Sequence, residues 1–410
     1  MLSKDTICSA IDNRQQEIID FTRSLIQTPS PTGHEAALAD LILQKFHSAG
    51  FSFSKIDPVG NVIGLLKGKG DGKSFLLNGH MDHVPHGEMP DPYSGKIMSG
   101  KAYGIDGPVV YGRGASDMKG ALSAMVMAGV ILHDLGITMN GDLMIAGTVY
   151  EEELGNIGPP ALIDIDNLRP DAALIGECTN LDLAYGNRGV VRTIVTTHGK
   201  SCHVSVQERG INALYKMTKI INNIQRLNNT LPSHPILGQA SWAICRMGVQ
   251  PNYANVVPDR CVAEIDTRSI PNFSLEDILE KQQHLINELT RNDPEFSASL
   301  TQPDINIETW TGYKTKANSV ASPFFIDPQH WLVTTGKNII EQVVQTDIRL
   351  KVWGFTTECY CFTERGIPVI GIGPGEERFT HSNNEVVSIS DITTATKIYA
   401  LLAAKICASP

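Results

Sequence analysis

The sequence has few of the features that mark nucleic-acid-binding, membrane or secreted proteins. Lys and Arg number 34 against 44 Asp and Glu, so no basic surplus is available to bind phosphates. No apolar run reaches the length of a membrane span. Residues 1–25 mix charged with apolar residues and contain no apolar core of a secretion signal. We therefore expect a cytoplasmic protein with no nucleic-acid partner and no membrane partner.

Paired cysteines are also scarce. The eight cysteines stand singly, apart from Cys359 and Cys361, and no Cys-x-x-Cys pair occurs. This pattern favours buried thiols in a reducing compartment over a disulfide framework. What remains is an ordinary globular composition, 42% hydrophobic and 19% charged, in a chain of 410 residues. That length predicts two or three domains.

The stretch Gly112-Arg-Gly-Ala-Ser-Asp-Met-Lys-Gly120 stands between a short apolar run and a longer run of helix formers. The longer run predicts a buried helix, so Asp117 lies where a strand ends and a helix begins. Such a turn suits the binding of a metal or a substrate at the edge of a sheet. Ser116 and Asp117 are also good capping residues, and a helix cap explains the turn equally well when it is taken alone.

Further strand-like runs each end in an acid or an imidazole. The residues that follow these runs are His80 and Asp82, the three glutamates 151–153, Glu177, and His381 beyond the glycine-rich residues 371–375. His80 and Asp82 point the same way, because strand side chains alternate between faces. Each residue alone has a structural explanation as a core histidine, an exposed helix start or a surface acid. Their arrival at the same end of several strands favours a functional site.

In this order the motifs resemble the co-catalytic zinc amidohydrolases and peptidases. That family includes acetylornithine deacetylase, succinyl-diaminopimelate desuccinylase, aminoacylase and carboxypeptidase G. The resemblance covers nearly the whole chain, and Ser201-Cys-His203 followed by residues 208–217 is most similar to a bacterial branch labelled selenium-metabolism hydrolases.

The expected fold is α/β. Strands and helices alternate to about residue 185, which predicts a mixed, mostly parallel sheet with flanking helices, and the resemblance implies a zinc exopeptidase-like arrangement. The later elements then read strand, helix, strand, strand, helix, strand, the order of a ferredoxin-like α+β domain. They are predicted at Val190–His198, Asn212–Leu227, Ala240–Met247, Val262–Ile270 and Ser274–Arg291, with a closing strand after them. The expected domains are 1–186 (catalytic, first part), 187–304 (inserted lid and dimerisation domain) and 305–410 (catalytic, second part).

The resemblance implies two divalent metal ions per chain. By family position the ligands are His80, Asp117, Glu152, Glu177 and His381. Asp117 would bridge the two ions, with His80 and Glu177 on one ion and Glu152 and His381 on the other. Oxygen and imidazole ligands without cysteine suit a catalytic Zn²⁺ site, and Co²⁺ or Mn²⁺ fits the same set.

Two further carboxylates have implied catalytic roles. Asp82 would accept a hydrogen bond from the far ring nitrogen of His80, and Glu151 would be the general base. A second register stays open, in which Glu152 and Glu153 take the roles of Glu151 and Glu152, because Leu154 and Gly155 complete a Glu-Glu-x-Gly pattern. Similarity to the related branch favours the first register.

The residues implied in substrate binding are His203, Asn255, Arg268 and Gly373. An arginine suits a substrate carboxylate, although a salt bridge to Asp266 or Glu264 is an alternative for Arg268. A histidine beside a scissile carbonyl can stabilise an oxyanion. Gly373 belongs either to a loop that approaches the substrate or to a simple turn. The sequence departs from the family at residues 356–358, where many members carry Thr-Asp, so the pocket shape is expected to differ.

The sequence thus predicts a dinuclear metal-dependent hydrolase of an amide-type C–N bond in a small N-acyl amino acid or related compound. The alternative within the enzyme class is a dipeptidase or carboxypeptidase. The alternative outside it is a catalytically silent metal-binding or ligand-binding homologue. The expected partners are a small-molecule substrate and a second copy of the chain, joined through the inserted domain.

Overall fold

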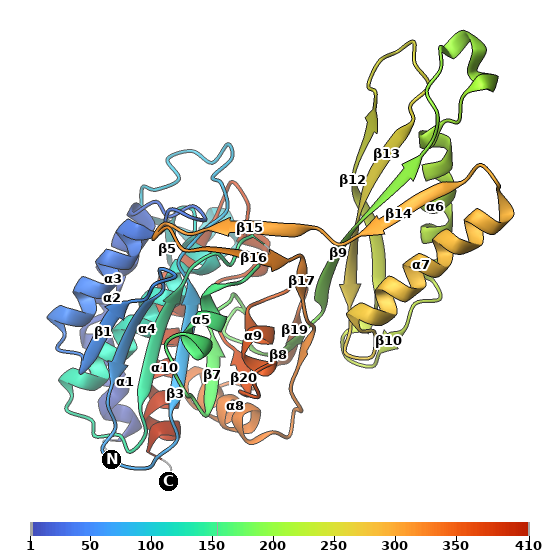
Figure 1. Cartoon of the computed structure of the whole chain (residues 1–410). Helices are drawn as coiled ribbons and strands as arrows, with labels where there is room; N and C mark the ends of the chain where they lie inside the picture. The colour runs from blue at the N-terminus through green and yellow to red at the C-terminus, as the bar shows by residue number, and fades with distance from the viewer. Residues whose placement is uncertain (1–2, 154, 409–410) are drawn as a thin grey trace.

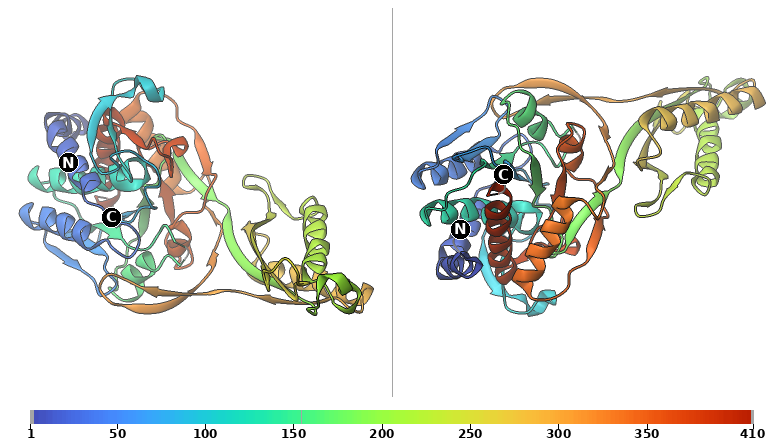
Figure 2. Two further views of the ribbon diagram at one scale, coloured as in Figure 1. Left: turned by 90° about the horizontal axis from the view of Figure 1, so that it is seen from above. Right: turned by 90° about the horizontal axis from the view of Figure 1, so that it is seen from below.

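The structure is a computed structural model that describes residues 3–153 and 155–408, and it consists of a larger α/β part and a smaller α+β part (Figure 1). Figure 2 shows that the smaller part extends away from the larger one. The chain enters the smaller part through β9 (Gly189–His198) and returns through β14 (Ser297–Thr301) and β15 (Asp304–Glu308). The predicted fold class is confirmed.

The larger part is built on a nine-stranded sheet. Its strand order is β1 (Phe53–Ile56), β2 (Val62–Leu66), β6 (Leu143–Thr148), β3 (Phe75–His80), β7 (Ala172–Ile175), β20 (Val369–Gly371), β8 (Leu183–Asn187) and β18 (Phe324–Phe325), with β19 (Leu350–Trp353) also paired to β8. The central strands β6, β3, β7 and β20 are parallel, and their residues are buried on both faces. Such apolar runs are typical of parallel strands that helices cover.

Helices pack around this sheet and against one another. They are α1 (Lys4–Asn13), α2 (Gln15–Gln27), α3 (Ala36–Ser48), α4 (Gly120–Asp134), α5 (Gly158–Asp164), α8 (Trp331–Val344), α9 (Cys359–Thr363) and α10 (Ile389–Cys407). The stretch Ala115–Asp134 is long and apolar enough to cross a membrane, yet its apolar window is wholly buried. A helix that is apolar on all sides has its place in the core, and α4 packs there against α10 and β3.

A separate three-stranded sheet contains β21 (Val386–Ser388), β5 (Pro108–Tyr111) and β4 (Lys96–Ser99). Residues 89–106 are rich in Gly, Pro and Tyr, a composition that predicts a loop, but they contain β4 and the short helix η1 (Gly100–Tyr103). The strand before Asp117 is β5, so it belongs to this small sheet and not to the central one. Asp117 nevertheless lies between a strand and a helix, as predicted.

The smaller part has the predicted βαββαβ order. Its strands are β9, β12 (Ser241–Gln250), β13 (Arg260–Ser269) and β14, and its helices are α6 (Ala213–Asn228) and α7 (Leu275–Asn292). The spatial order β12-β13-β9-β14 is antiparallel throughout, and a separate apolar core fills the space between this sheet and the two helices. The boundaries 187 and 304 remain our proposal for the limits of this domain; β8 ends at Asn187 and β15 begins at Asp304.

Candidate active site

The parallel centre of the sheet brings the predicted residues together at one edge. His80 is the last residue of β3, the glutamates 151–153 follow β6, and Glu177 follows β7. Because β3 pairs in parallel with both β6 and β7, all three strands end at the same edge. The convergence that the sequence predicted for these strands is present in the structure.

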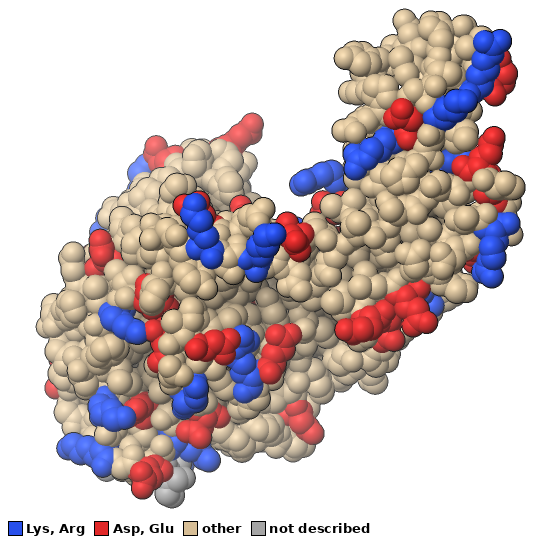
Figure 3. All heavy atoms as spheres, viewed as in Figure 1, with Lys and Arg blue, Asp and Glu red and all other residues tan. Residues whose placement is uncertain are grey.

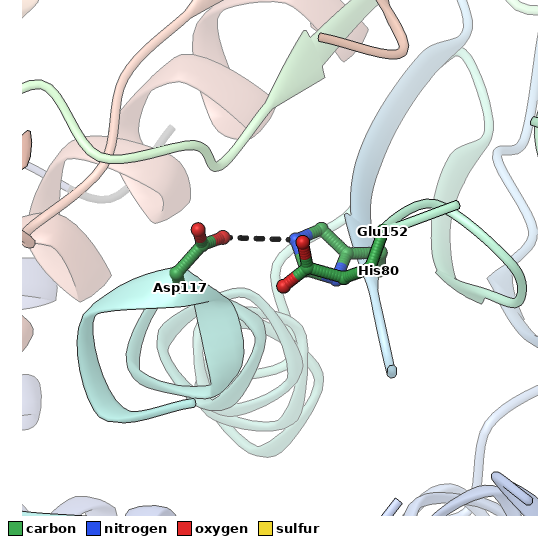
Figure 4. Close-up of side chains that lie close together, drawn as sticks. All are labelled: His80, Asp117 and Glu152. Atoms are coloured by element: carbon green, nitrogen blue, oxygen red, sulfur yellow. Dashed lines mark hydrogen bonds and ion pairs between the residues drawn. The ribbon is translucent and has the colours of Figure 1, made fainter. Parts of the chain in front are cut away.

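Asp117 lies between two histidine rings. One carboxylate oxygen is 3.0 Å from Nε2 of His80, and the other is 3.2 Å from Nε2 of His381. Figure 4 shows the carboxylate of Asp117 directed at the His80 ring, with Glu152 close by. Nε2 of His381 is also 3.0 Å from Oε2 of Glu152, and Nε2 of His80 is 3.5 Å from Oε1 of Glu177. Asp117 therefore presents one oxygen to each side of a two-sided cluster.

Two overlapping groups of side chains have the spacing of metal ligands. His80, Asp117 and Glu152 form one group, and His80, Glu151 and Glu177 form the other, with ligand atoms within 4.8 Å of one another in each. Oε2 of Glu177 is buried and accepts no hydrogen bond from the described residues. A crowded set of carboxylates and imidazoles with a spare buried oxygen fits divalent cations.

Asp82 fixes both the histidine and the glutamates. Its carboxylate accepts hydrogen bonds from the backbone N–H groups of Glu151 and Glu152, each at 3.1 Å, and from the Thr32 hydroxyl at 2.8 Å. Nδ1 of His80 is 2.9 Å from the backbone oxygen of Asp82 and 3.5 Å from its carboxylate. The backbone oxygen is thus the nearer partner of the imidazole, and the carboxylate anchors the turn that carries the glutamates.

Glu151 and Glu177 line a cavity at this edge of the sheet, and the ligand atoms of both lie within 4.8 Å of His80. Burial raises the pKa of Glu151 well above its usual value; the His80 ring opposes this rise and the Glu177 carboxylate adds to it. A carboxylate at this place in the cavity can take a proton from a water molecule held beside the candidate metal ligands, which is the requirement for a general base.

Glu385, which the sequence reasoning missed, holds the turn that carries Asp117. Its carboxylate accepts backbone hydrogen bonds from Gly114, Ser116 and Asp117 at 2.9 to 3.0 Å, and it binds the Arg113 guanidinium at 2.5 Å. All four partners and Glu385 itself are buried. The only sequence signal was an acid placed directly before the apolar strand β21.

Glu358, at the position where the sequence departs from the family, lies beneath the site. It is fully buried and accepts hydrogen bonds from the Asn78 amide at 2.7 Å and the Thr148 hydroxyl at 2.9 Å. Burial raises its pKa to about 7. Thr356, two residues earlier, lines the cavity. The difference from the family at residues 356–358 therefore affects both the cavity wall and the buried residues that pack under the site.

A cavity of about 650 Å³ opens from the carboxylates towards the smaller part. Arg268 lines it, and its Nε is 2.9 Å from Asp266, so the salt bridge given as the alternative is present. Binding of a substrate carboxylate by Arg268 stays a prediction. Arg192 and Arg246 line the cavity as well, and the sequence reasoning missed them. Their signal was weak, since single arginines on strands are common on protein surfaces.

The other three predicted substrate residues lie outside the lining of this cavity. His203 and Asn255 are exposed and adjacent, since the N–H of Val204 donates to the Asn255 carbonyl. Figure 1 shows the segment after β9, which contains His203, and the connection between β12 and β13, which contains Asn255, at the far end of the smaller part. Gly373 is buried, and a Cβ there would lie 2.3 Å from the Glu177 carbonyl oxygen. Gly373 therefore permits close packing behind Glu177.

Comparisons with known proteins agree with this geometry. The sequence model of peptidase family M20/M25/M40 matches residues 76–405. The uncharacterized protein YgeY of Escherichia coli (strain K12) is 28% identical over 394 residues, which cover 95% of this chain and 94% of that protein. Acetylornithine deacetylase of Myxococcus xanthus is 26% identical over 383 residues, which cover 90% and 92% of the two chains.

A solved structure shares the fold. The crystal structure of the Bacillus subtilis YXEP protein, described as a dinuclear metal binding peptidase from the M20 family, superimposes with a TM-score of 0.73. The match covers 97% of this chain and 100% of that chain at 13% sequence identity. The arrangement of the two parts is therefore found in another protein as well.

Proposed function

Because the chain belongs to peptidase family M20/M25/M40, it is a metal-dependent hydrolase of amide or peptide bonds, and we propose that it cleaves the amide-type C–N bond of a small N-acyl amino acid. The relative named acetylornithine deacetylase supports the deacylase form of the reaction. The likeness to a solved peptidase supports a second candidate, a dipeptidase or carboxypeptidase that uses the same centre.

The observation that carries the proposal is the position of Asp117, with one oxygen 3.0 Å from His80 and the other 3.2 Å from His381. In the proposed centre Asp117 would be shared by two divalent ions, His80 and Glu177 would hold one ion, and Glu152 and His381 would hold the other. Zn²⁺ is our first choice, with Co²⁺ and Mn²⁺ as alternatives. When bound, such ions polarise a carbonyl and lower the pKa of water.

The remaining roles belong to the chain itself. Glu151 takes a proton from the attacking water and passes it to the nitrogen of the leaving amine, so that acid and base are one residue. Asp82 holds the backbone of Glu151 and Glu152 and faces the His80 ring, which keeps the imidazole and both glutamates in place. Arg268 binds a carboxylate of the substrate.

Metal content tests the centre directly. Protein reconstituted with excess Zn²⁺ and then desalted should hold two ions per chain by elemental analysis, because five ligand side chains converge and one of them is shared. Asp117→Asn keeps the shape of the side chain but removes its charge, so its metal content should fall below two. A wild-type content that never exceeds one, unchanged in Asp117→Asn, would contradict the shared-carboxylate centre.

A substrate screen separates the two candidate functions. N-acetyl, N-formyl and N-succinyl amino acids and dipeptides would be assayed with Zn²⁺, Mn²⁺ and Co²⁺. Release of free amino acid from the N-acyl compounds alone supports the deacylase. Release from the dipeptides alone supports the peptidase.

A homodimer formed through the inserted domain is part of the proposal. Exposed apolar side chains lie beside His203 at the far end of the smaller part, with Val204 46% and Tyr253 74% exposed. A second copy of the chain would cover this surface and receive His203 and Asn255 near its own cavity, since neither residue lines the cavity of its own chain.

A further inference from the structure

The face of the inserted sheet that is turned to the cavity carries more arginines than acids. Strand pairing puts Arg192 of β9 opposite Asp266 of β13, and Arg246 of β12 opposite Glu264 of β13. Because side chains alternate along a strand, Asp266, Glu264 and Arg268 share one face of β13 with both paired arginines. The intervening residues of β13 face the helices and belong to the core of the smaller part.

Asp266 and Glu264 do not occupy all the hydrogen-bond donors of these arginines. Arg268 has the one close contact, 2.9 Å from Nε to Asp266. Nε of Arg192 is 3.6 Å from Asp266 and 3.7 Å from Glu264, and Nη1 of Arg246 is 3.9 Å from Glu264, all longer than hydrogen bonds. Nε of Arg192 is buried and donates no hydrogen bond to any described residue. Guanidinium groups placed this way retain donors for a ligand.

The three arginines line the same cavity as the glutamates of the candidate metal centre. Figure 3 shows the hollow between the two parts and a basic side chain that projects into it from the smaller part. An anionic ligand there meets arginines on one wall and, once metal is bound, cations on the other. Diagonal neighbours on adjacent strands are about 7–8 Å apart, which places Arg192 within reach of a ligand held by Arg268.

We infer that Arg192 and Arg246 form a second carboxylate subsite, so that the substrate of this chain carries two carboxylates. This inference rests on the proposed function and narrows its substrate class. Arg268 holds the first carboxylate, and the guanidinium groups of Arg192 and Arg246 hold the second by charge-assisted hydrogen bonds. The second carboxylate belongs either to an acidic amino-acid side chain or to a dicarboxylic acyl group, and both place the same anion in the cavity.

Binding without turnover tests the subsite. Calorimetry on zinc-loaded wild-type protein would compare glutarate with its monoamide, which has the same shape and one charge less. We expect glutarate to bind at least about tenfold more tightly than the monoamide, as a charge-assisted hydrogen bond implies. Arg192→Gln and Arg246→Gln should each reduce this ratio, and the double variant should bring it close to one.

Arg226→Gln is the matched control, because Arg226 is exposed on α6, hydrogen-bonds Asn223 alone among the described residues, and lies outside the cavity lining. It makes the same charge change and should leave the ratio unaltered. A wild-type ratio near one would overturn the subsite. So would a ratio that persists in the double variant.

Kinetics then locate the second carboxylate. N-acetyl-glutamate would be compared with N-acetyl-glutamine, and an N-succinyl amino acid with its N-succinamyl counterpart. If Arg192→Gln loses the preference for the diacid through a higher KM, with kcat little changed, the subsite is supported. The substrate pair that shows this loss identifies whether the second carboxylate lies on the amino acid or on the acyl group. An equal loss of kcat/KM for acid and amide would overturn the subsite, because the arginines would then not distinguish the second carboxylate. If wild type hydrolyses no amide while the glutarate ratio holds, the proposed function fails and the subsite stands.

Discussion

Glu151 and Glu152 are sequence neighbours with different surroundings. Oε2 of Glu152 is 3.0 Å from the His381 ring, and its other oxygen accepts the Val84 N–H at 3.3 Å. The Glu151 side chain makes no hydrogen bond to the described residues and lies against His80 and Glu177. A carboxylate held by fixed partners, such as Glu152, is suited to bind a metal ion. A carboxylate without such partners, such as Glu151, is suited to act as the general base.

We therefore predict different losses for the two residues. Glu151→Gln should abolish turnover while metal content stays near two per chain, because the amide cannot accept the proton. Glu152→Gln should lose both metal and turnover. Losing either group should lower kcat by roughly 10²-fold or more. Elemental analysis and steady-state kinetics on the same preparations measure both effects.

The second register predicts a different pattern, in which Glu152→Gln keeps its metal and Glu153→Gln loses it. Glu153 is exposed and lines the outer part of the cavity, so in our register Glu153→Gln should retain metal and most activity. It is therefore the matched control. Leu154, which suggested the second register, lies outside the described residues.

Among single residues, sequence predicted those with a distinctive local motif. His80, Asp117 and Glu177 follow recognisable apolar runs, and the structure brings their side chains together. Glu385 could not be found this way, because its role depends on backbone N–H groups about 270 positions earlier in the chain. No sequence motif marks Arg192 either, because only strand pairing turns its side chain towards the cavity.

At the scale of elements, an ion network joins the first helices to the core. The carboxylate of Glu17 on α2 binds Arg14 at 2.7 Å and Lys45 of α3 at 2.7 Å, and Arg14 also binds Asp134 at the end of α4 at 2.6 Å. The Arg14 guanidinium, with Lys45, lowers the pKa of Glu17 from about 4.5 to about 2. The network thus joins α2, α3 and α4 through the Glu17 carboxylate, which is 40% exposed, and Arg14 at the junction of α1 and α2.

We predict that Glu17→Gln lowers the free energy of unfolding by about 1 kcal/mol at pH 7, a value discounted for the exposure of the pair. The folded pKa is depressed, so the wild-type stabilisation is complete above pH 4.5 and is lost as pH falls towards 2. The two proteins should therefore converge in stability below pH 4.5. Urea unfolding at several pH values measures the difference, and a gap that stays constant down to pH 3 would contradict the assignment.

The same region shows what element prediction missed. Sequence periodicity predicts one helix from Asp12 to Gln27, whereas the structure has α1 and α2 with a break at Arg14. The break follows Asn13, a weak helix former, and Arg14 turns to reach Asp134, a contact that sequence does not reveal. α4, by contrast, was predictable, because an entirely apolar helix has only the core to occupy.

At the scale of the whole molecule, the smaller part holds His203 outside the cavity of its own chain. His203 is exposed, its Nδ1 is 2.7 Å from the Ser205 hydroxyl, and its sequence neighbour Val204 is exposed as well. The ring is thus available to another molecule. In the proposed symmetric dimer, each inserted domain would carry its His203 to the cavity of the partner.

This arrangement predicts complementation between two inactive variants. Glu151→Gln lacks the base, and His203→Ala lacks the group that would stabilise the oxyanion in the partner's cavity. Each homodimer should be nearly inactive. In a mixed dimer, the cavity of the His203→Ala chain has its own Glu151 and receives His203 from the Glu151→Gln chain, so one of its two sites is complete. With random pairing half of the dimers are mixed, and about a quarter of wild-type activity should return.

The measurement is turnover after co-expression of the two variants with different affinity tags and purification through both tags. That selection yields mixed dimers alone, which should have about half of wild-type activity per dimer. Glu151→Gln co-expressed with Glu153→Gln is the control that leaves His203 on both chains, and it sets the activity expected from one intact base per dimer. If His203 acts within its own chain, the mixed dimer has no complete site, and its activity should equal the mean of the two inactive homodimers. That result, or a protein that stays monomeric at assay concentration, would remove His203 from the proposed site.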